Sequence, residues 1–417
     1  MEYDVVVAGG GPAGIGAAIA AARNEARTLL IEGSNCLGGM LTSGLVGMIR
    51  TAGDGGGIVR ELWNRLVEVD GAQITDSHAA IIPAVGRVVA LEMAHEAGVD
   101  ILFHTLAEGV SMDGAALTGV YIANKAGRQL VRCRMAVDAT GDGDLAAWSG
   151  APFDKGREGD GYLQAVSLNF VLAGVDTERL PDREAFDTAC REALDSGEVE
   201  LPAYHRTLSF GRHWPGYPPG IVHYQCDMAA DIDASDPESL TCGEALCHQR
   251  VLKIWRFLKR SFEAYRDSVI IHIATRLGVR ESRRVRGEKT LVEADVLEGR
   301  KHPDGIARCS WYMDLHDGQD KHPMDEYRAR RAPPEGDFYE IPYGCLVPLQ
   351  VESLLVSGRC ISSTRPANGS LRLQPTCMNT GQAAGTAAAL CVAGGTSPRE
   401  LSGQDLRRIL TEQGMEL

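Results

Sequence analysis

Size and charge describe an ordinary globular protein and exclude two kinds of partner. The chain has 417 residues and a formal net charge of −14, and an acidic protein without a basic face is a poor binder of nucleic acid. No apolar run approaches the length of a membrane span. We therefore expect two intertwined domains and a small-molecule substrate, and a homo-oligomer is compatible with these features.

The cysteines and the start of the chain predict a cytoplasmic protein. The eleven cysteines are an odd number and lack the spacing of a disulfide framework, which is typical of reduced thiols. An apolar strand begins almost at Met1, and this leaves no room for a signal peptide.

The first glycine-rich segment predicts a dinucleotide-binding unit. A strand at Val5–Ala8 runs into Gly9, Gly11 and Gly14, and an alanine-rich helix follows at 13–23. In this pattern the first glycine permits the tight turn, the second lets the backbone approach a pyrophosphate, and the third allows close packing of helix and strand. The helix N-terminus then directs its free N–H groups at the phosphates.

An acidic residue after the second strand supports this prediction. The strand Arg27–Ile31 ends in Glu32, about 20 residues downstream of the turn, where a ribose-binding acid is expected. A carboxylate at this position suits a 2′-hydroxyl and repels a 2′-phosphate. The alternatives are a similar turn that binds no nucleotide, or a surface glutamate.

The remaining predicted elements alternate between strands and helices. The loop 33–44 contains too much glycine for a helix. After it we expect helices at 58–69 and 84–97, a strand at 99–104, a β-meander at 107–131, and a strand at 134–138 that ends in a second glycine turn.

The character of the chain changes between Ala151 and Tyr339. Here we expect a strand at 164–172, a helix at 182–196, an irregular stretch at 201–219, a helix at 240–262, a strand at 269–274 and a polar, loop-rich stretch at 301–336. The pattern then returns to the first type, with an apolar strand at 353–357, a polar loop at 365–376 and a helix rich in small residues at 377–393.

Several motifs together resemble a known family. They are Gly9/Gly11/Gly14 with Glu32, the loop 37–42 (Leu-Gly-Gly-Met-Leu-Thr), the segments 138–144, 278–284 and 358–362, and the segment 375–385. The chain resembles the FAD-dependent oxidoreductases of the glutathione-reductase superfamily, in the fumarate-reductase-like branch. The match runs nearly from end to end, and the motifs are specific for the family and not for a substrate.

The resemblance implies an α/β fold with one FAD site. A Rossmann-like FAD-binding domain, with a central parallel sheet, helices and a small β-meander, is formed by residues 1–150 and 340–417. It is interrupted by an inserted, mixed α+β substrate domain at residues 151–339.

The resemblance also implies which residues contact FAD. The adenosine and diphosphate contacts are Gly9, Gly11, Pro12, Ala13, Gly14, Glu32 and Ala107. The contacts along the ribityl chain and at the flavin ring are Gly38, Gly39, Met40, Leu41, Thr42, Thr140, Gly141, Gly358, Arg359, Met378, Asn379, Gly381 and Gln382. Arg359 departs from the family pattern, because many members have an aspartate after the late glycine. A helix N-terminus near Met378–Gln382 stabilises the negative charge of reduced flavin.

The function implied is hydride transfer between a small organic substrate and flavin N5. Arg280 and Arg284 belong to an arginine cluster that suits an anionic or carbonyl-bearing substrate, and Arg372 and Arg365 lie in the loop expected at the flavin. Internal salt bridges are an equally good explanation of the cluster.

The acid/base candidates are His272, His213, His223 and Tyr343, and the sequence does not assemble them into a pair. A satisfied core histidine is the alternative for His272. No cysteine–histidine spacing matches a metal site, and we expect none.

Two other functions stay open at this stage. Asp142-Gly143 is similar to a turn of aromatic hydroxylases and favours a flavin monooxygenase, but the late Gly-Asp motif of those enzymes is missing. The second alternative is a flavin-binding protein whose FAD is structural or sensory. The substrate, the reaction direction, the electron acceptor and any covalent flavin link are not determined by the sequence.

Overall fold

The computed structural model describes residues 1–51, 54–75, 78–202, 212–213, 217–317 and 328–417. Its centre is a mostly parallel sheet. Strands lie in the order β6-β2-β1-β9, and β20 pairs with β9 in parallel on the other side. The bounds are β1 Glu2–Ala8, β2 Thr28–Ile31, β6 Asp100–Leu102, β9 Gly127–Asp138 and β20 Leu354–Val356. The parallel sheet predicted from the sequence is confirmed.

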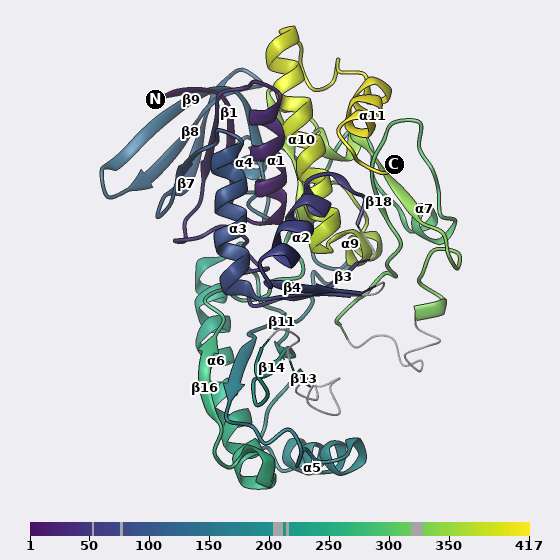
Figure 1. Ribbon diagram of the computed structural model, residues 1–417. Coiled ribbons are helices and arrows are strands. Elements are labelled where there is room, and N and C mark those ends of the chain that lie inside the picture. The colour runs from purple at the N-terminus through teal and green to yellow at the C-terminus, as the bar shows by residue number, and fades with distance from the viewer. Residues whose placement is uncertain (52–53, 76–77, 203–211, 214–216, 318–327) are drawn as a thin grey trace.

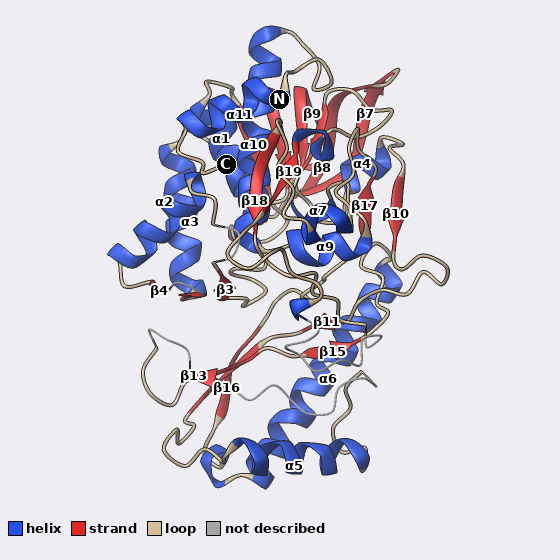
Figure 2. Cartoon of the chain, turned by 90° about the vertical axis from the view of Figure 1, so that its right-hand side faces the viewer, coloured by secondary structure: helices blue, strands red, loops and turns tan. Residues whose placement is uncertain are grey.

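Helices cover one face of this sheet. Figure 1 shows α3, α1 and α10 running side by side, and Figure 2 shows them on one side of the strands. Strands β1 and β2 are mostly buried, and burial of both faces of the sheet explains their continuous apolar sequence. The helices are α1 Pro12–Arg23, α2 Gly57–Glu68, α3 Pro83–Glu96, α4 Asp144–Trp148, α10 Gln374–Gly394 and α11 Gly403–Glu412.

The predicted meander is present. Strands β7 (Leu106–Asp113), β8 (Ala116–Asn124) and the first half of β9 pair antiparallel in sequence order. The second half of β9 belongs to the parallel sheet, so a single long strand joins the two arrangements. A separate small sheet contains β3 (Met48–Arg50), β4 (Ala72–Ile74) and β5 (His78–Ile81).

Buried apolar side chains form two clusters. The larger one surrounds the central sheet and includes residues from Tyr3 to Met415. The smaller one runs mainly from Val166 to Leu277 and belongs to the lower part of the molecule in Figures 1 and 2. Its elements are β11 Val166–Ser167, β12 Phe170–Ala173, α5 Arg183–Asp195, β13 Arg212–His213, β14 Val222–Tyr224, β15 Asp227–Ala229, α6 Pro237–Ser261, η1 Glu263–Tyr265 and β16 Val269–Ile273. The domain boundaries at 151 and 339 stay a prediction.

The remaining elements connect this part back to the sheet. They are β10 Phe153–Lys155, β17 Arg283–Val285, α7 Glu293–Leu297, β18 Gly305–Cys309, β19 Tyr339–Pro342, η2 Tyr343–Leu346, η3 Gly358–Cys360 and α9 Arg365–Leu371. None of the helices among the described residues has the length and apolarity needed to cross a membrane.

Two local predictions were wrong. The loop expected at 365–376 contains helix α9, where Pro366 starts the first turn and tertiary burial outweighs the low propensity of Gly369. The strand expected at 164–172 is split between β11 and β12, because Asn169 turns its side chain to the backbone of Gly44. The described part of the stretch 301–336 is mostly loop, as predicted, and also contains strand β18. Of the irregular stretch expected at 201–219, residues 203–211 and 214–216 lie outside the described residues.

Candidate active site

The first turn has the geometry that its glycines predict. Gly9 has φ +99°, and a Cβ there would lie 2.5 Å from the carbonyl oxygen of Ala139. A Cβ on Gly14 would lie 1.7 Å from the carbonyl oxygen of Gly9. A Cβ on Gly11, in contrast, would meet no atom within 4 Å. The turn is therefore closed where helix and strand pack, and open beside the N-terminus of α1, where Pro12 and Ala13 follow.

Glu32 is buried beneath this turn. Its carboxylate accepts the N–H of Gly10 at 2.7 Å and the N–H of Ser34 at 2.7 Å. The guanidinium of Arg276 lies 3.1 Å from the same oxygen that Ser34 contacts. The alternative of a surface glutamate is excluded, because only 2% of Glu32 is exposed.

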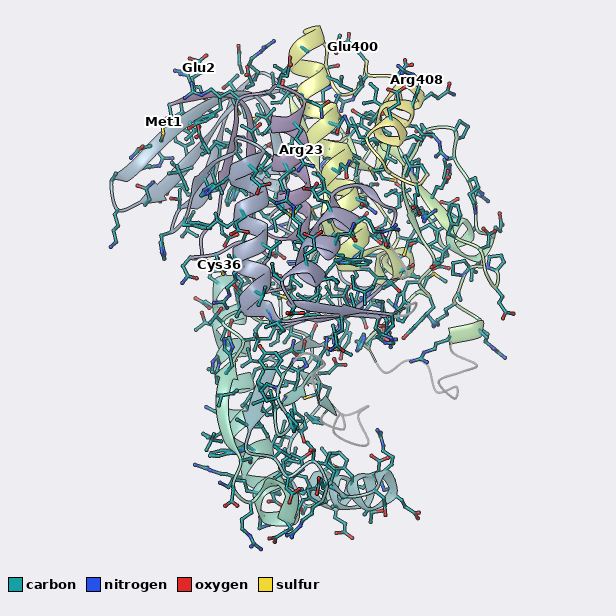
Figure 3. All side chains as sticks on the ribbon, in the orientation of Figure 1. Met1, Glu2, Arg23, Cys36, Glu400 and Arg408 are labelled. Atoms are coloured by element: carbon teal, nitrogen blue, oxygen red, sulfur yellow. The ribbon has the colours of Figure 1, made fainter. Side chains whose placement is uncertain are left out.

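The second glycine pair lies directly against the first turn. The Gly38 N–H donates to the Gly10 carbonyl at 2.8 Å, and a Cβ on Gly39 would lie 2.9 Å from the Cα of Gly11. Thr42 donates to the Leu37 carbonyl at 2.7 Å and closes the loop that contains Met40 and Leu41. Cys36, labelled in Figure 3, is buried at the start of this loop with its Sγ 3.4 Å from Ser43 Oγ.

The loop continues between three other parts of the chain. The Asn169 side-chain amide donates to the Gly44 carbonyl at 2.8 Å, and the Thr275 N–H donates to the Ser43 carbonyl at 2.9 Å. The Gln374 side chain donates to the Val46 carbonyl at 2.8 Å. The loop thus joins the nucleotide turn, the smaller cluster and the start of α10.

Helix α10 packs tightly on α1 and begins earlier than predicted. It starts at Gln374, so the expected helix start near Met378 lies in its second turn. A Cβ on Gly381 would lie 2.0 Å from the Ala13 carbonyl oxygen. Gln382 accepts the N–H of Ile58 at 2.9 Å, so this side chain binds the start of α2. Met378 and Asn379 are also buried.

The second glycine turn lies beside the first. Asp138 is fully buried and accepts hydrogen bonds from the Thr140 N–H, the Thr140 hydroxyl and the Ala146 N–H. Burial raises the pKa of Asp138 to about 6. Gly141 is covered by the guanidinium of Arg359, which donates to Asp142 at 2.6 Å. Arg359 is thereby held by protein carboxylate.

Gly358 and Ala107 lie at opposite ends of this arrangement. The Gly358 N–H donates to the Thr380 hydroxyl of α10 at 3.1 Å. Ala107 lies on β7, one residue after Leu106, whose side chain is close to Gly33 at the Glu32 end. Ala107 thus lies near the Glu32 end of the first turn, and Gly358 lies against α10. The contacts of these residues with FAD stay a prediction.

A cluster of charged side chains lies at the start of α10. Arg280 donates to Asp227 at 2.6 Å, and His316 Nδ1 lies 2.7 Å from the second oxygen of Asp227. His316 Nε2 lies 3.2 Å from Asp314. Burial and Arg280 lower the pKa of His316, but Asp227 and Asp314 together raise it above its ordinary value. His316 therefore lies between two carboxylates.

Arg372 completes this cluster. It donates to the Asp314 carbonyl at 2.8 Å and lies 3.4 Å from the Gln164 side-chain oxygen. Burial, followed by the charge of Arg280, lowers the pKa of Arg372 to about 10. Its Nε is buried without a hydrogen-bond partner, and it makes no ion pair with a described carboxylate.

Glu281 fixes the neighbouring side chains. It accepts the Gln164 N–H at 2.7 Å and the Nε and Nη2 of Arg365 at 3.0 Å. Arg284 lies 3.8 Å from Glu281 and donates to the Gly156 carbonyl. Most of the arginine cluster is thus paired internally, which is the alternative that the sequence left open, and Arg280 and Arg372 are brought together.

The predicted acid/base residues do not join this cluster in the described structure. His272 lies on β16 opposite Val171, and burial and then Arg87 lower its pKa. Burial lowers the pKa of His223 to about 3. The Tyr343 hydroxyl donates to the Pro398 carbonyl. The side chain of His213 lies outside the described residues.

Sequence reasoning missed His316, Asp227, Asp314 and Gln164. His316 and Asp314 lie in the polar stretch predicted as loop, and Asp227 follows a strand that was not predicted. The signal available was the short run Asp314-Leu315-His316-Asp317, but its partners lie far away in the chain, up to 152 residues from Gln164.

A family comparison shows which family the chain belongs to. A family model described as FAD dependent oxidoreductase matches residues 4–410. The chain belongs to this family. It is a flavoprotein enzyme, an oxidoreductase with FAD as cofactor. No curated protein matches the chain.

Solved structures agree at the level of the fold. CabE, an aromatic hydroxylase from angucycline biosynthesis, matches with a TM-score of 0.50 and 13% identity over 99% of this chain and 68% of that chain. Flavin-dependent brominase Bmp2 matches with a TM-score of 0.49 and 15% identity over 99% and 83%. The geranylgeranyl bacteriochlorophyll reductase-like protein Ta0516 from Thermoplasma acidophilum matches with 0.46 and 13% over 99% and 84%. The likeness to CabE shows a shared fold and nothing finer.

The residues present fit FAD. The free space beside Gly11 lies at the N-terminus of α1, where backbone N–H groups and the helix dipole favour a diphosphate. Glu32 lies at the end of β2, where a ribose is bound in such folds. The loop Gly38–Gly39 borders the same space.

Proposed function

We propose that the protein transfers a hydride between a small anionic organic substrate and N5 of FAD, with Arg372 binding the substrate and Arg280, which is paired with Asp227, lying beside it. FAD supplies the two-electron chemistry when bound, and the protein supplies orientation and electrostatics. The contacts with FAD are those predicted from the sequence.

The observation that carries this proposal is the state of Arg372. The neighbouring arginines Arg280 and Arg365 pair with Asp227 and Glu281, whereas Arg372 contacts only neutral oxygens among the described residues, and its Nε is buried without a hydrogen-bond partner. Burying a guanidinium without a directly paired carboxylate is costly. Burial and then the charge of Arg280 lower the pKa of Arg372, and the more distant charges of Asp314, Glu281 and Asp227 offset only part of this effect. A substrate carboxylate would supply the missing charge in a bidentate geometry.

The position of Arg372 supports the same proposal. Arg372 precedes the first residue of α10 by two positions, and the N-terminus of this 21-residue helix adds positive partial charge. The side-chain oxygen of Gln164 accepts hydrogen bonds from both the Arg372 guanidinium and the His316 N–H, so Gln164 holds the guanidinium in place. Asp314 contacts both Arg372, through its carbonyl, and His316, through its carboxylate.

Three finer assignments belong to the same proposal. The motifs at 37–42 and 375–385 support the fumarate-reductase-like branch. The smaller buried cluster, with its own sheet and helices, supports a substrate domain inserted at 151–339. The free state of all eleven cysteines supports a cytoplasmic location.

Anaerobic flavin bleaching tests the proposal. The purified protein is mixed with a panel of organic acids, sugars and amines, and bleaching by an acid is expected. Arg372→Ala should lower the second-order rate of bleaching by roughly 10- to 100-fold, because one charged interaction is lost. Arg286→Ala is the matched control, since Arg286 is 57% exposed and pairs only with Asp154 on the surface.

Three results would contradict the proposal. Bleaching by uncharged compounds only would contradict the proposal that the substrate is an anion. Hydroxylation of an added aromatic compound that depends on oxygen and NAD(P)H would replace it with monooxygenation. No bleaching by any compound of the panel would favour a structural or sensory flavin.

A further inference from the structure

The carboxylate expected at the ribose already has a partner from a distant segment. Glu32 is 2% exposed, and Arg276, which lies 244 residues later, donates to it at 3.1 Å. The side chain of Arg276 is 45% exposed, so it covers Glu32 from the solvent side. The pair joins the end of β2 to the segment that follows β16.

The backbone on both sides of Arg276 is fixed. The Thr275 N–H donates to the Ser43 carbonyl at 2.9 Å, in the loop that continues from Gly38–Gly39. The Leu277 N–H lies 3.3 Å from the Glu244 carboxylate on α6, and the Leu277 side chain is buried in the smaller cluster. The segment therefore presents Arg276 to Glu32 by its fold.

An exposed apolar side chain lies close to Gly33, the residue that follows this carboxylate. Leu106 is 60% exposed, among the highest exposures of the large apolar side chains. A Cβ on Gly33 would lie 2.7 Å from Leu106 Cδ2 and 3.9 Å from Arg276 Nη2. Leu106 and Arg276 therefore both border Gly33, directly after the ribose carboxylate.

The geometry points to Arg276 and Leu106 as a clamp for the adenosine half of FAD. Leu106 supplies an apolar surface for the adenine ring, and Arg276 supplies a planar cation beside the ribose. This inference concerns the cofactor alone, so it does not depend on the proposed substrate.

The hydrogen-bond capacity of Glu32 explains why Arg276 stays in place. One oxygen accepts Ser34 and Arg276 and is saturated, whereas the other accepts only Gly10 and keeps one lone pair for a ribose hydroxyl. Adenosine on top of this pair removes water from the carboxylate. A carboxylate that loses water and also lacks its cation is strongly disfavoured, so Arg276 stabilises the bound state.

The test measures binding instead of activity. The full chain is stripped of flavin, and the dissociation constants of FAD and of ADP are measured by calorimetry and by flavin fluorescence. The variants are Arg276→Ala, Arg276→Lys and Leu106→Ala. Matched controls are Arg286→Ala and Leu297→Ala, which change an exposed arginine and an exposed leucine elsewhere.

We expect Arg276→Ala to raise the dissociation constants of FAD and of ADP by the same factor, about 3- to 10-fold. Arg276→Lys should recover part of this lost affinity. Leu106→Ala should raise both dissociation constants about 3-fold. The control variants should bind FAD and ADP as tightly as the parent protein does. The loss from Arg276→Ala should also be smaller in a Glu32→Gln background, since the two residues act together.

Two results would overturn the clamp. Unchanged or tighter FAD binding by Arg276→Ala would show that Arg276 competes with ribose or is a bystander. If Arg276→Ala lowers the affinity for FAD but not for ADP, Arg276 acts on a part of FAD outside the adenosine half. If Arg276→Ala does not fold, Arg276→Lys and Leu106→Ala decide the same question. Failure of the parent protein to bleach with organic acids would leave this result unaffected.

Discussion

Gly385 tests whether the contact between α10 and α1 sets the position of the cofactor helix. A Cβ on Gly385 would lie 2.0 Å from the carbonyl oxygen of Ala17, whereas real Cβ atoms essentially never approach within 3.0 Å of such an atom. Gly385→Ala therefore requires the two helix backbones to separate by at least about 1 Å.

The expected cost follows from two opposing terms. Overpacking of a tight interface costs about 1–3 kcal/mol, and a backbone-to-backbone contact without a movable side chain belongs at the upper end. Replacing glycine by alanine inside a helix returns about 1 kcal/mol. We expect a net loss of about 2 kcal/mol in the free energy of unfolding.

The assay is urea denaturation of the FAD-loaded protein, followed by circular dichroism and flavin fluorescence. Gly394→Ala is the matched control in the same helix, because its Cβ would approach only Thr396, at 3.5 Å. It should be neutral or slightly stabilising. Gly381→Ala makes the same clash against Ala13, at the start of α1, so it should also weaken FAD binding. If Gly385→Ala is as stable as Gly394→Ala, the close contact is not what fixes α1.

Two further predictions concern buried carboxylates. Glu281→Gln should lower the melting temperature and weaken substrate binding, because Arg365 loses a buried partner and Gln164 loses its anchor; a melting temperature equal to that of the parent protein would contradict the role of Glu281. The pKa of Asp138 is raised to about 6 in the folded protein, against an ordinary value of 3.8. The folded state therefore holds a proton that the unfolded state has lost, and stability should fall as pH rises from about 4 to 6, by up to about 3 kcal/mol. Asp138→Asn should remove this pH dependence while losing the Ala146 hydrogen bond, and denaturation midpoints across this pH range measure it; parallel profiles for the two proteins would show that Asp138 does not titrate there.

The sequence by itself determined the nucleotide-binding part of the fold. The requirements at the three glycines are local. Gly9 needs a positive φ, Gly11 leaves free space beside the backbone, and Gly14 allows the carbonyl of Gly9 to approach closely. Such requirements act within a few residues and restrict the amino acid directly. For the same reason the turn and helix at the N-terminus were predicted to within one residue, and the strand before them was predicted with its correct end but begins three residues earlier than expected.

Only the tertiary structure decided which distant residues meet. His316 and Asp227 are 89 residues apart, and Arg276 and Glu32 are 244 residues apart. Charged residues on the surface and in a buried cluster look alike in a sequence, because their pairing depends on how separate elements pack. Arg372 is the clearest case. The sequence marked it as one of several arginines, and in the part of the chain that the structure describes it forms no ion pair, while its neighbours Arg280 and Arg365 pair with carboxylates. The physical reason is that local preferences specify turns and helices, whereas the charge balance of a buried site is a property of the folded chain.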